Sequence, residues 1–226
     1  MMVFCYHLTT KFFVSINIKN ISAGYGKKMV LSQISFEVSS GETVLLTGGN
    51  GSGKSTVLKC IYSLLPLWNG EILFENKRID TLNPSDLIRL GIVYIPQKNF
   101  NFENLSVEEN LKIAGNIYSK NERCDRIEDV YQQLGLKALK KRKPFNLSGG
   151  EKKLLAFGMG LIHKPKLILF DEPLAGIDNN NTDKILAIFN SIINDPCLAM
   201  IIVEHKDAVR DIFNRKIKIE LGRIVN

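Results

Sequence analysis

Apolar and polar residues alternate in several segments of the first third of the chain. The alternation runs through Val14–Ile18 and Leu31–Ser39 and returns more weakly at Glu71–Glu75. Strict alternation is typical of an antiparallel strand that buries one face and leaves the other in water. The pattern predicts a partly exposed, N-terminal antiparallel β-subdomain. Residues 1–13 lack the alternation and are expected to form a leader before it.

A second kind of segment is short and continuously apolar. Thr43–Thr47, Leu167–Phe170 and Ala199–Val203 are rich in Val, Ile and Leu, and Ile92–Ile95 is a further candidate. Parallel strands that are covered on both faces have this pattern. We therefore expect an α/β fold with a mostly parallel central sheet, in one domain over residues 14–226.

Helical periodicity and capping residues dominate the chain between the strands at Ile92 and Leu167. The candidate helices here are Ser106–Tyr118, Glu122–Leu134 and Gly150–Ile162. Ser106 and Glu109 are the two partners of a capping box. We expect a helical subdomain over about residues 98–163, inserted into the core. Core helices are expected at Lys54–Leu65, Asp183–Ile193 and Asp207–Phe213, and a strand pair that turns at Gly222 is expected at Lys216–Val225.

The composition indicates one cytoplasmic domain. With 226 residues, 45% of them hydrophobic, the chain can bury a core of α/β size. Its longest apolar stretches, such as Cys197–Val203, fall far short of the roughly 20 residues that span a bilayer as a helix. Met1–Thr10 has neither the basic start nor the cleavage site of a secretory signal. The four cysteines form no CxxC pair, which argues against a zinc site and a disulfide framework.

The positive charge of the chain is dispersed. A formal net charge of +7 would suit nucleic acid or anionic lipid, but the basic residues form no stripe, and we expect no nucleic acid partner. The densest cluster consists of Lys137, Lys140, Lys141, Arg142 and Lys143. We interpret this cluster as a solvated surface loop. The more specific alternative is an electrostatic contact with lipid headgroups or with an acidic partner.

Glycines are concentrated directly after the strand Thr43–Thr47, in a segment that matches the pattern G-x-x-x-x-G-K-[ST]. The segment consists of Gly48, Gly49, Asn50, Gly51, Ser52, Gly53, Lys54, Ser55 and Thr56. Glycines let backbone N–H groups approach phosphate oxygens, and the next helix adds the partial positive charge of its N-terminus. We expect Lys54 to contact the β- and γ-phosphates of a nucleotide, Ser55 to bind Mg²⁺ and Thr56 to bind a phosphate further back. A glycine-rich turn that matches by chance is the weaker alternative.

Two carboxylates end the apolar strand Leu167–Phe170. Open α/β sheets place functional groups at such strand ends, and two acids after a buried strand are unfavourable without partners. We expect Asp171 to hold Mg²⁺, directly or through water, and Glu172 to polarise the water that attacks the γ-phosphate. An N-cap for the following turn would explain one acid better than two.

Polar residues also follow two other apolar strands. His205 lies shortly after Ala199–Val203, where it can hydrogen-bond the γ-phosphate and the attacking water. Gln97 follows Ile92–Ile95, and its amide can meet a metal-bound water or the nucleophile. Alone, each would be an ordinary surface histidine or loop glutamine. Their position at strand ends makes both candidates for the catalytic site.

Leu147-Ser148-Gly149-Gly150-Glu151 precedes the strand that ends in the two acids. This arrangement resembles the signature of ABC ATPases, and Ile16–Val225 is similar to one of their nucleotide-binding domains. The resemblance implies a P-loop NTPase core that binds and hydrolyses ATP with Mg²⁺. It also implies that Tyr25 stacks on adenine and that Gln97 couples the site to the helical subdomain.

The same resemblance assigns His205 as the switch histidine and Ala175–Asp178 as a loop that reaches across a dimer. Ser148, Gly149 and Gly150 begin a predicted helix and can bind an anionic oxygen. In the family they complete the phosphate loop of a second nucleotide-binding domain packed head to tail. We therefore expect a dimer, either of two copies or with a paralogue. Some residues depart from the family pattern: Lys152, Lys153, Leu154, Met159, Ala175 and Asn179.

The resemblance further implies a subunit that powers transport through integral membrane permease subunits, and that lies peripherally on the cytoplasmic face of the inner (plasma) membrane. Several segments, including Gly91–Gln97, are most similar to branched-chain amino acid importer and lipopolysaccharide-export ATPases. Amino acid import and lipid or lipopolysaccharide-type export are therefore the alternatives. A soluble ABC ATPase that acts on ribosomes or nucleic acid is disfavoured, because such proteins usually carry two cassettes or a long coiled coil. The intact catalytic residues also disfavour a degenerate scaffold.

Overall fold

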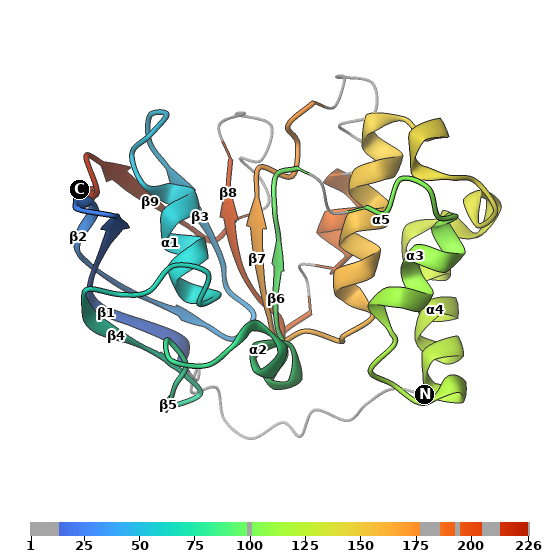
Figure 1. Ribbon diagram of the computed structural model, residues 1–226, viewed down its shortest axis with the longest axis horizontal. Coiled ribbons are helices and arrows are strands. Elements are labelled where there is room, and N and C mark those ends of the chain that lie inside the picture. Colours follow the sequence, from blue (N-terminus) through green and yellow to red (C-terminus); the bar gives the residue numbers. More distant parts are fainter. Residues whose placement is uncertain (1–13, 99–100, 177–185, 193–194, 205–212, 226) are drawn as a thin grey trace.

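The structure is a computed structural model that describes residues 14–98, 101–176, 186–192, 195–204 and 213–225. Two sheets occupy one side and the centre of the molecule, and a group of helices occupies the other side (Figure 1). The predicted leader and most of the predicted helix Asp207–Phe213 lie outside the described residues. Of the predicted helix Asp183–Ile193, residues 186–192 are described and are helical.

The predicted N-terminal antiparallel sheet is present. In spatial order it consists of β2 (Lys28–Ser39), β1 (Val14–Tyr25), β4 (Asn69–Phe74) and β5 (Lys77–Arg78). The strand β1 is longer than predicted because its register shifts between Ile18 and Ile21, where Asn20 takes a positive φ of 48°. Such a bulge resets the period-two pattern, so the alternation ends at Ile18 although pairing continues.

The central sheet is mostly parallel, as predicted. In spatial order it consists of β10 (Arg223–Val225), β9 (Arg215–Glu220), β3 (Thr43–Thr47), β8 (Ala199–Val203), β7 (Leu167–Asp171) and β6 (Ile92–Ile95). Only the pair β9 and β10 is antiparallel in this sheet. Every residue of β6, β7 and β8 is buried. The carboxyl ends of β3, β6, β7 and β8 therefore meet at one edge.

One face of the central sheet packs on the antiparallel sheet together with α1 (Lys54–Ile61) and α2 (Pro84–Leu90). The helix α2 was not predicted. Its start carries ordinary signals, because the Asn83 side chain accepts a hydrogen bond from the N–H of Asp86 and Pro84 occupies the first turn. Seven residues are too few to show helical periodicity, which explains why the sequence pattern missed it.

The opposite face of the sheet packs on the helical half of the molecule. Its elements are α3 (Val107–Ala114), α4 (Lys120–Leu134), two 3₁₀ turns (Leu136–Leu139 and Pro144–Asn146) and α5 (Gly149–Leu161). Phe157 of α5 lies 5.5 Å from Phe170 of β7 and 4.9 Å from Phe189, measured between ring centroids. The capping box at Ser106 is present, but α3 ends one turn earlier than predicted, at Gly115.

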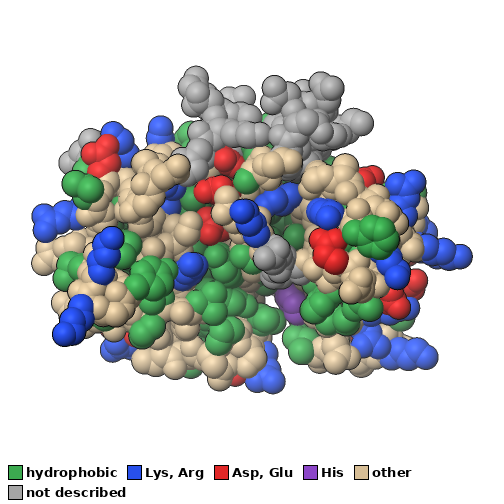
Figure 2. Space-filling view, turned by 45° about the horizontal axis from the view of Figure 1, so that its top comes forward, with side chains coloured by type: hydrophobic (Ala, Val, Ile, Leu, Met, Phe, Trp, Pro, Cys, Tyr) green, Lys and Arg blue, Asp and Glu red, His purple; other side chains and the backbone are tan. Residues whose placement is uncertain are grey.

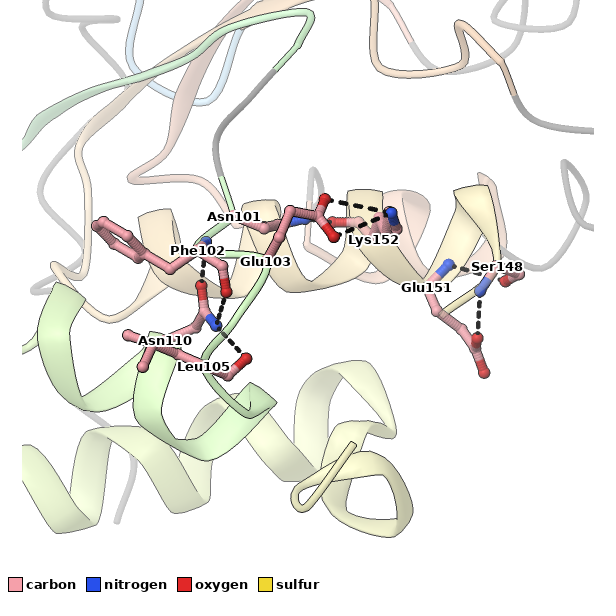
Figure 3. Close-up of polar contacts among 8 residues, drawn as sticks. All are labelled: Asn101, Phe102, Glu103, Leu105, Asn110, Ser148, Glu151 and Lys152. Carbon is pink, nitrogen blue, oxygen red and sulfur yellow. Dashed lines mark hydrogen bonds and ion pairs between the residues drawn. The ribbon is translucent and has the colours of Figure 1, made fainter. Parts of the chain in front are cut away.

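A buried asparagine connects α3 to the segment before it (Figure 3). Asn110 is fully buried, and its side chain accepts a hydrogen bond from the N–H of Phe102 at 2.7 Å. Its amide lies 2.9–3.1 Å from the carbonyls of Phe102, Leu105 and Ser106. One side chain thus satisfies the backbone of a segment that has no regular structure.

None of the helices in the described part of the chain combines the length and the apolar character needed to cross a membrane. The fold class predicted from the pattern is confirmed: a P-loop α/β core with an antiparallel sheet on one side and a group of helices on the other.

Replacement of Asn110 tests how strongly this side chain supports the helical half. We expect Asn110→Ala to lower the free energy of unfolding by about 2–4 kcal/mol, because a fully buried side chain and its hydrogen bonds are removed, including those to the Phe102 N–H and the Leu105 carbonyl. Equilibrium unfolding in urea measures the change. The matched control is Lys112→Ala on the same helix, whose exposed ion pair with Glu108 contributes about 0–1 kcal/mol. Equal stability of both variants would contradict this role for Asn110.

Candidate functional site

The predicted phosphate-binding segment Gly48–Thr56, called the phosphate loop below, runs from the end of β3 into α1, as predicted. Gly48 has a φ of 141°, and a Cβ there would lie 2.0 Å from the carbonyl oxygen of Ile219. Gly53, the residue before α1, has a φ of 109°, and a Cβ there would lie 2.6 Å from the Leu31 side chain. Glycine is therefore required at both positions by backbone conformation and by space. The loop leads directly into the N-terminus of α1.

Lys54 is buried within this loop. Its Nζ donates hydrogen bonds to the carbonyls of Gly48 and Gly49, at 3.0 and 2.8 Å, and lies 3.4 Å from the Ser52 hydroxyl. Burial lowers the pKa of the Lys54 amine, while the nearby carboxylates of Glu172 and Asp171 oppose that change. The loop thus holds a cation among its own carbonyls, at the centre of an anion-binding turn.

Ser55 and Asp171 are brought together from segments far apart in the sequence. The Ser55 hydroxyl donates to Asp171 Oδ1 at 2.8 Å, and Asp171 is 5% exposed. On the other side, the Tyr94 hydroxyl donates to Asp171 Oδ2 at 3.3 Å. Burial and the Asp171 charge raise the pKa of Tyr94, so it remains a hydrogen-bond donor. A hydroxyl paired with a carboxylate is an oxygen donor set that suits Mg²⁺.

Glu172 and Gln97 lie together at the ends of the adjacent strands β7 and β6. The Gln97 side-chain amide donates to the Glu172 carboxylate. Glu172 has a φ of 49°, a left-handed conformation that costs a residue with a side chain roughly 1–2 kcal/mol. Its N–H donates to the carbonyl of Val203 in β8, at 2.8 Å. His205, the third predicted catalytic residue, and Ile177 and Asp178 lie outside the described residues.

Tyr25 lies at the end of β1, beside α1. The residue is 49% exposed, and Lys59 Nζ of α1 lies 3.5 Å from its hydroxyl and 5.9 Å from the ring centroid. An exposed aromatic ring next to the helix that begins at the phosphate loop is available for stacking on a base. The expected adenine contact is compatible with this position.

Ser148, Gly149 and Gly150 lie at the start of α5. The Ser148 side chain accepts a hydrogen bond from the Glu151 N–H, and the Glu151 carboxylate accepts one from the Ser148 N–H (Figure 3). In Figure 1 the helices α1 and α5 lie on opposite sides of the strands β3, β8, β7 and β6. The structure therefore does not bring these residues to the phosphate loop of the same chain.

Two residues near the site were missed by the sequence interpretation. Tyr94 lies in a continuously apolar strand, where the pattern gives no indication of which side chain points to Asp171. Glu204 is 4% exposed and accepts a hydrogen bond from the N–H of Leu174, at 2.9 Å. Its position directly after the apolar strand β8 was the available signal. Both residues support the segments that carry the acids.

This combination of a phosphate loop, a Ser–Asp pair and a second acid at the edge of a parallel sheet defines a P-loop nucleoside triphosphatase. A comparison with protein families matches residues 31–175 to the family described as ABC transporter. One relative is the probable branched-chain amino acid transport ATP-binding protein LivF of Archaeoglobus fulgidus. It is 35% identical over 187 residues, which cover 81% of this chain and 78% of the relative.

Two solved structures are also similar. The ADP conformation of an ATP-binding cassette of an ABC transporter matches with a TM-score of 0.86 and 28% identity, over 94% of this chain and 90% of that one. The dimeric structure of a bacterial ABC transporter cassette matches with a TM-score of 0.83 and 25% identity, over 93% and 97%. The chain therefore belongs to the ABC transporter family. It is an ATP-binding subunit, an ATPase coupled to transport.

Removal of the Lys54 amine tests the phosphate loop. We expect Lys54→Ala to weaken ATP binding roughly 10- to 100-fold, because hydrogen bonds to charged groups are worth about 1.5–3 kcal/mol. Titration calorimetry of the purified chain measures the dissociation constant. Lys77→Ala, on the exposed strand β5, is the control for the loss of a positive charge. ATP affinity equal to that of the unmodified chain would contradict the assignment.

Proposed function

We propose that two ATP molecules bind between this subunit and a second nucleotide-binding domain, packed head to tail, and that closure of the pair powers a permease. The observation that carries the proposal is the separation of the signature from the phosphate loop within one chain (Figure 1). The phosphate loop of one domain would be completed by the signature residues of the other domain. ATP favours the closed pair of domains because it binds that state more tightly than the open one. Hydrolysis of ATP lets the pair open again. The second domain is another copy or a paralogue.

The loop residues Gly48–Thr56 bind the phosphates through backbone N–H groups, and Lys54 turns from the loop carbonyls to the β- and γ-phosphates. Tyr25 stacks on adenine. Ser148, Gly149 and Gly150 contact the nucleotide held by the other domain, since a helix start at which Ser148 and Gly149 are exposed favours an anionic oxygen.

Mg²⁺ fits the pair formed by Ser55 and Asp171, with Gln97 as a further ligand. The part of the chain that is described holds no group of three His, Cys, Asp or Glu residues able to bind a metal. Such a group is not required, because Mg²⁺ bound with a nucleotide usually takes one or two carboxylates besides phosphate oxygens and waters. When bound, the ion neutralises charge on the β- and γ-phosphates.

Glu172 accepts the proton of the attacking water, and His205 contacts the γ-phosphate. The Gln97 amide contacts the Glu172 carboxylate. Gln97 can therefore exchange between Glu172 and the nucleotide, which would link occupancy of the site to the segment that leads into the helical half.

The permease is proposed to contact an apolar groove between the core and the helical half. The groove has a volume of about 590 Å³. Its walls include Tyr94 and Pro96, and Pro96 directly precedes Gln97 in the sequence. Among its lining residues Leu64, Phe102, Ile113 and Ile117 are 45–57% exposed. Figure 2 shows hydrophobic side chains gathered between the two halves, beside a histidine. An exposed apolar groove marks a contact site, and a helix of a permease subunit suits its shape and its proximity to Gln97.

Amino acid import is the proposed transport activity, because the name of the similar LivF protein describes branched-chain amino acid transport. Nothing in the comparisons favours lipid export. We place the subunit peripherally on the cytoplasmic face of the inner membrane, where ATP is available and permease subunits are reached.

Replacement of the proposed base tests this function. We expect Glu172→Gln to bind ATP, to lose roughly 10²-fold or more of its turnover, and to remain as an ATP-bound dimer, because only the proton acceptor is removed. Phosphate release measures turnover, and gel filtration with light scattering measures the dimer.

Glu75→Gln is the matched control, since Glu75 is exposed and pairs with Lys166 at the protein surface. It should retain the turnover of the unmodified chain. Normal turnover in Glu172→Gln would refute the role of Glu172. A monomer with ATP bound would refute a pair made of two copies of this chain.

A further inference from the structure

Two adjacent lysines of α5 contact different parts of the segment that follows β6. Lys152 Nζ lies 3.2 and 3.3 Å from the two carboxylate oxygens of Glu103, and the Asn101 amide donates to the Lys152 carbonyl at 3.0 Å (Figure 3). Lys153, the next residue, instead contacts the backbone at the catalytic strand ends.

The Lys153 ammonium connects α5 to both of those strand ends. Its Nζ donates to the carbonyl of Gln97 at 2.7 Å and lies 3.3 Å from the carbonyl of Glu172. Because the Gln97 amide also donates to the Glu172 carboxylate, the three residues form a closed triangle of contacts. Two of its corners follow β6 and β7, and the third belongs to the helix that begins with Ser148.

The surroundings of Lys153 make these hydrogen bonds stronger than surface ones. The side chain is partly buried at a polar pocket of about 240 Å³, between α5 and the Gln97 segment. Burial lowers the pKa of the Lys153 amine, while the carboxylates of Glu204, Glu172 and Asp171 oppose that change. Hydrogen bonds from a charged donor that is partly removed from water are stronger than neutral ones.

The backbone of Glu172 needs such support. Its left-handed φ of 49° is unfavourable for a residue with a side chain, and such conformations persist where surrounding contacts hold them. The N–H of Glu172 is held by Val203, and Lys153 reaches its carbonyl. A change at Lys153 therefore acts on the peptide that aims the Glu172 carboxylate.

We propose that Lys153 is a positioning residue, whose ammonium fixes the Gln97 and Glu172 backbones relative to the signature helix. The orientation of the proposed base then depends on the place of α5, so that a shift of the helical half changes turnover. The inference rests on the proposed role of Glu172 in ATP hydrolysis. Lys153 contacts neither the phosphate loop nor Tyr25 in any interaction of the described residues, so ATP binding is separable from it.

The test compares Lys153→Met with Lys152→Met in the full chain. Methionine keeps an unbranched apolar stem and removes only the ammonium. For Lys153→Met we expect kcat to fall about 5- to 20-fold while KM for ATP changes less than about 2-fold, since Lys153 acts on the base and not on the binding loop. Lys152→Met loses only a partly exposed ion pair and should keep kcat within about 2-fold. Lys153→Arg, which keeps a charged donor, should recover at least half of the lost kcat.

Each outcome decides the proposal. A kcat for Lys153→Met within 2-fold of the unmodified chain, or an equal loss in Lys152→Met, would overturn it. A rise in KM together with a lower melting temperature, without recovery in Lys153→Arg, would indicate a structural role and would also overturn it. If Lys153→Met does not fold, the kcat of Lys153→Arg against Lys153→Gln decides, with Arg expected to be the more active. Absence of ATP hydrolysis by the unmodified chain would refute the proposed function instead.

Discussion

Parallel pairing of β3, β8, β7 and β6 is the constraint on which the site depends. Pairing in one direction places the carboxyl ends of four strands at the same edge, so residues distant in sequence become neighbours. Ser55 and Asp171 lie within a hydrogen bond of each other for this reason, and so do Gln97 and Glu172. The strands remain in register because both faces of the sheet are buried, and slipping by one residue would expose apolar side chains.

The two faces of this sheet serve different purposes. One face packs on the antiparallel sheet and α1, in a continuous core that holds the phosphate loop in place. The other face packs on the helical half, with the Phe157, Phe170 and Phe189 rings at its centre. Near the site, α5 of the helical half makes polar contacts with the strand ends of the core. The apolar groove lies between the core and the helical half. Polar contacts can rearrange at a lower cost than a close-packed core, which suits coupling between nucleotide and permease.

Local signals account for both the successes and the errors of the sequence interpretation. The apolar strands were predicted because their apolar runs are continuous. The loop Gly48–Thr56 was predicted because it matches its motif and lies between a predicted strand and a predicted helix. The end of β1 was missed because a bulge interrupts its alternation, and α2 because seven residues show no period. The helix α3 ends at Ala114, before Gly115, because glycine has a low helix propensity, whereas the apolar residues beyond it continue the helical pattern.

The fold class, the phosphate loop, the acids at the end of β7 and the family signature could be predicted from the amino-acid sequence, because each depends on local pattern and residue type. Which polar groups meet could be learned only from the three-dimensional structure. It placed Tyr94 on Asp171 and Lys153 between Gln97 and Glu172. Such contacts depend on strand order and on the direction in which a helix crosses the sheet, and neither is written in local sequence pattern.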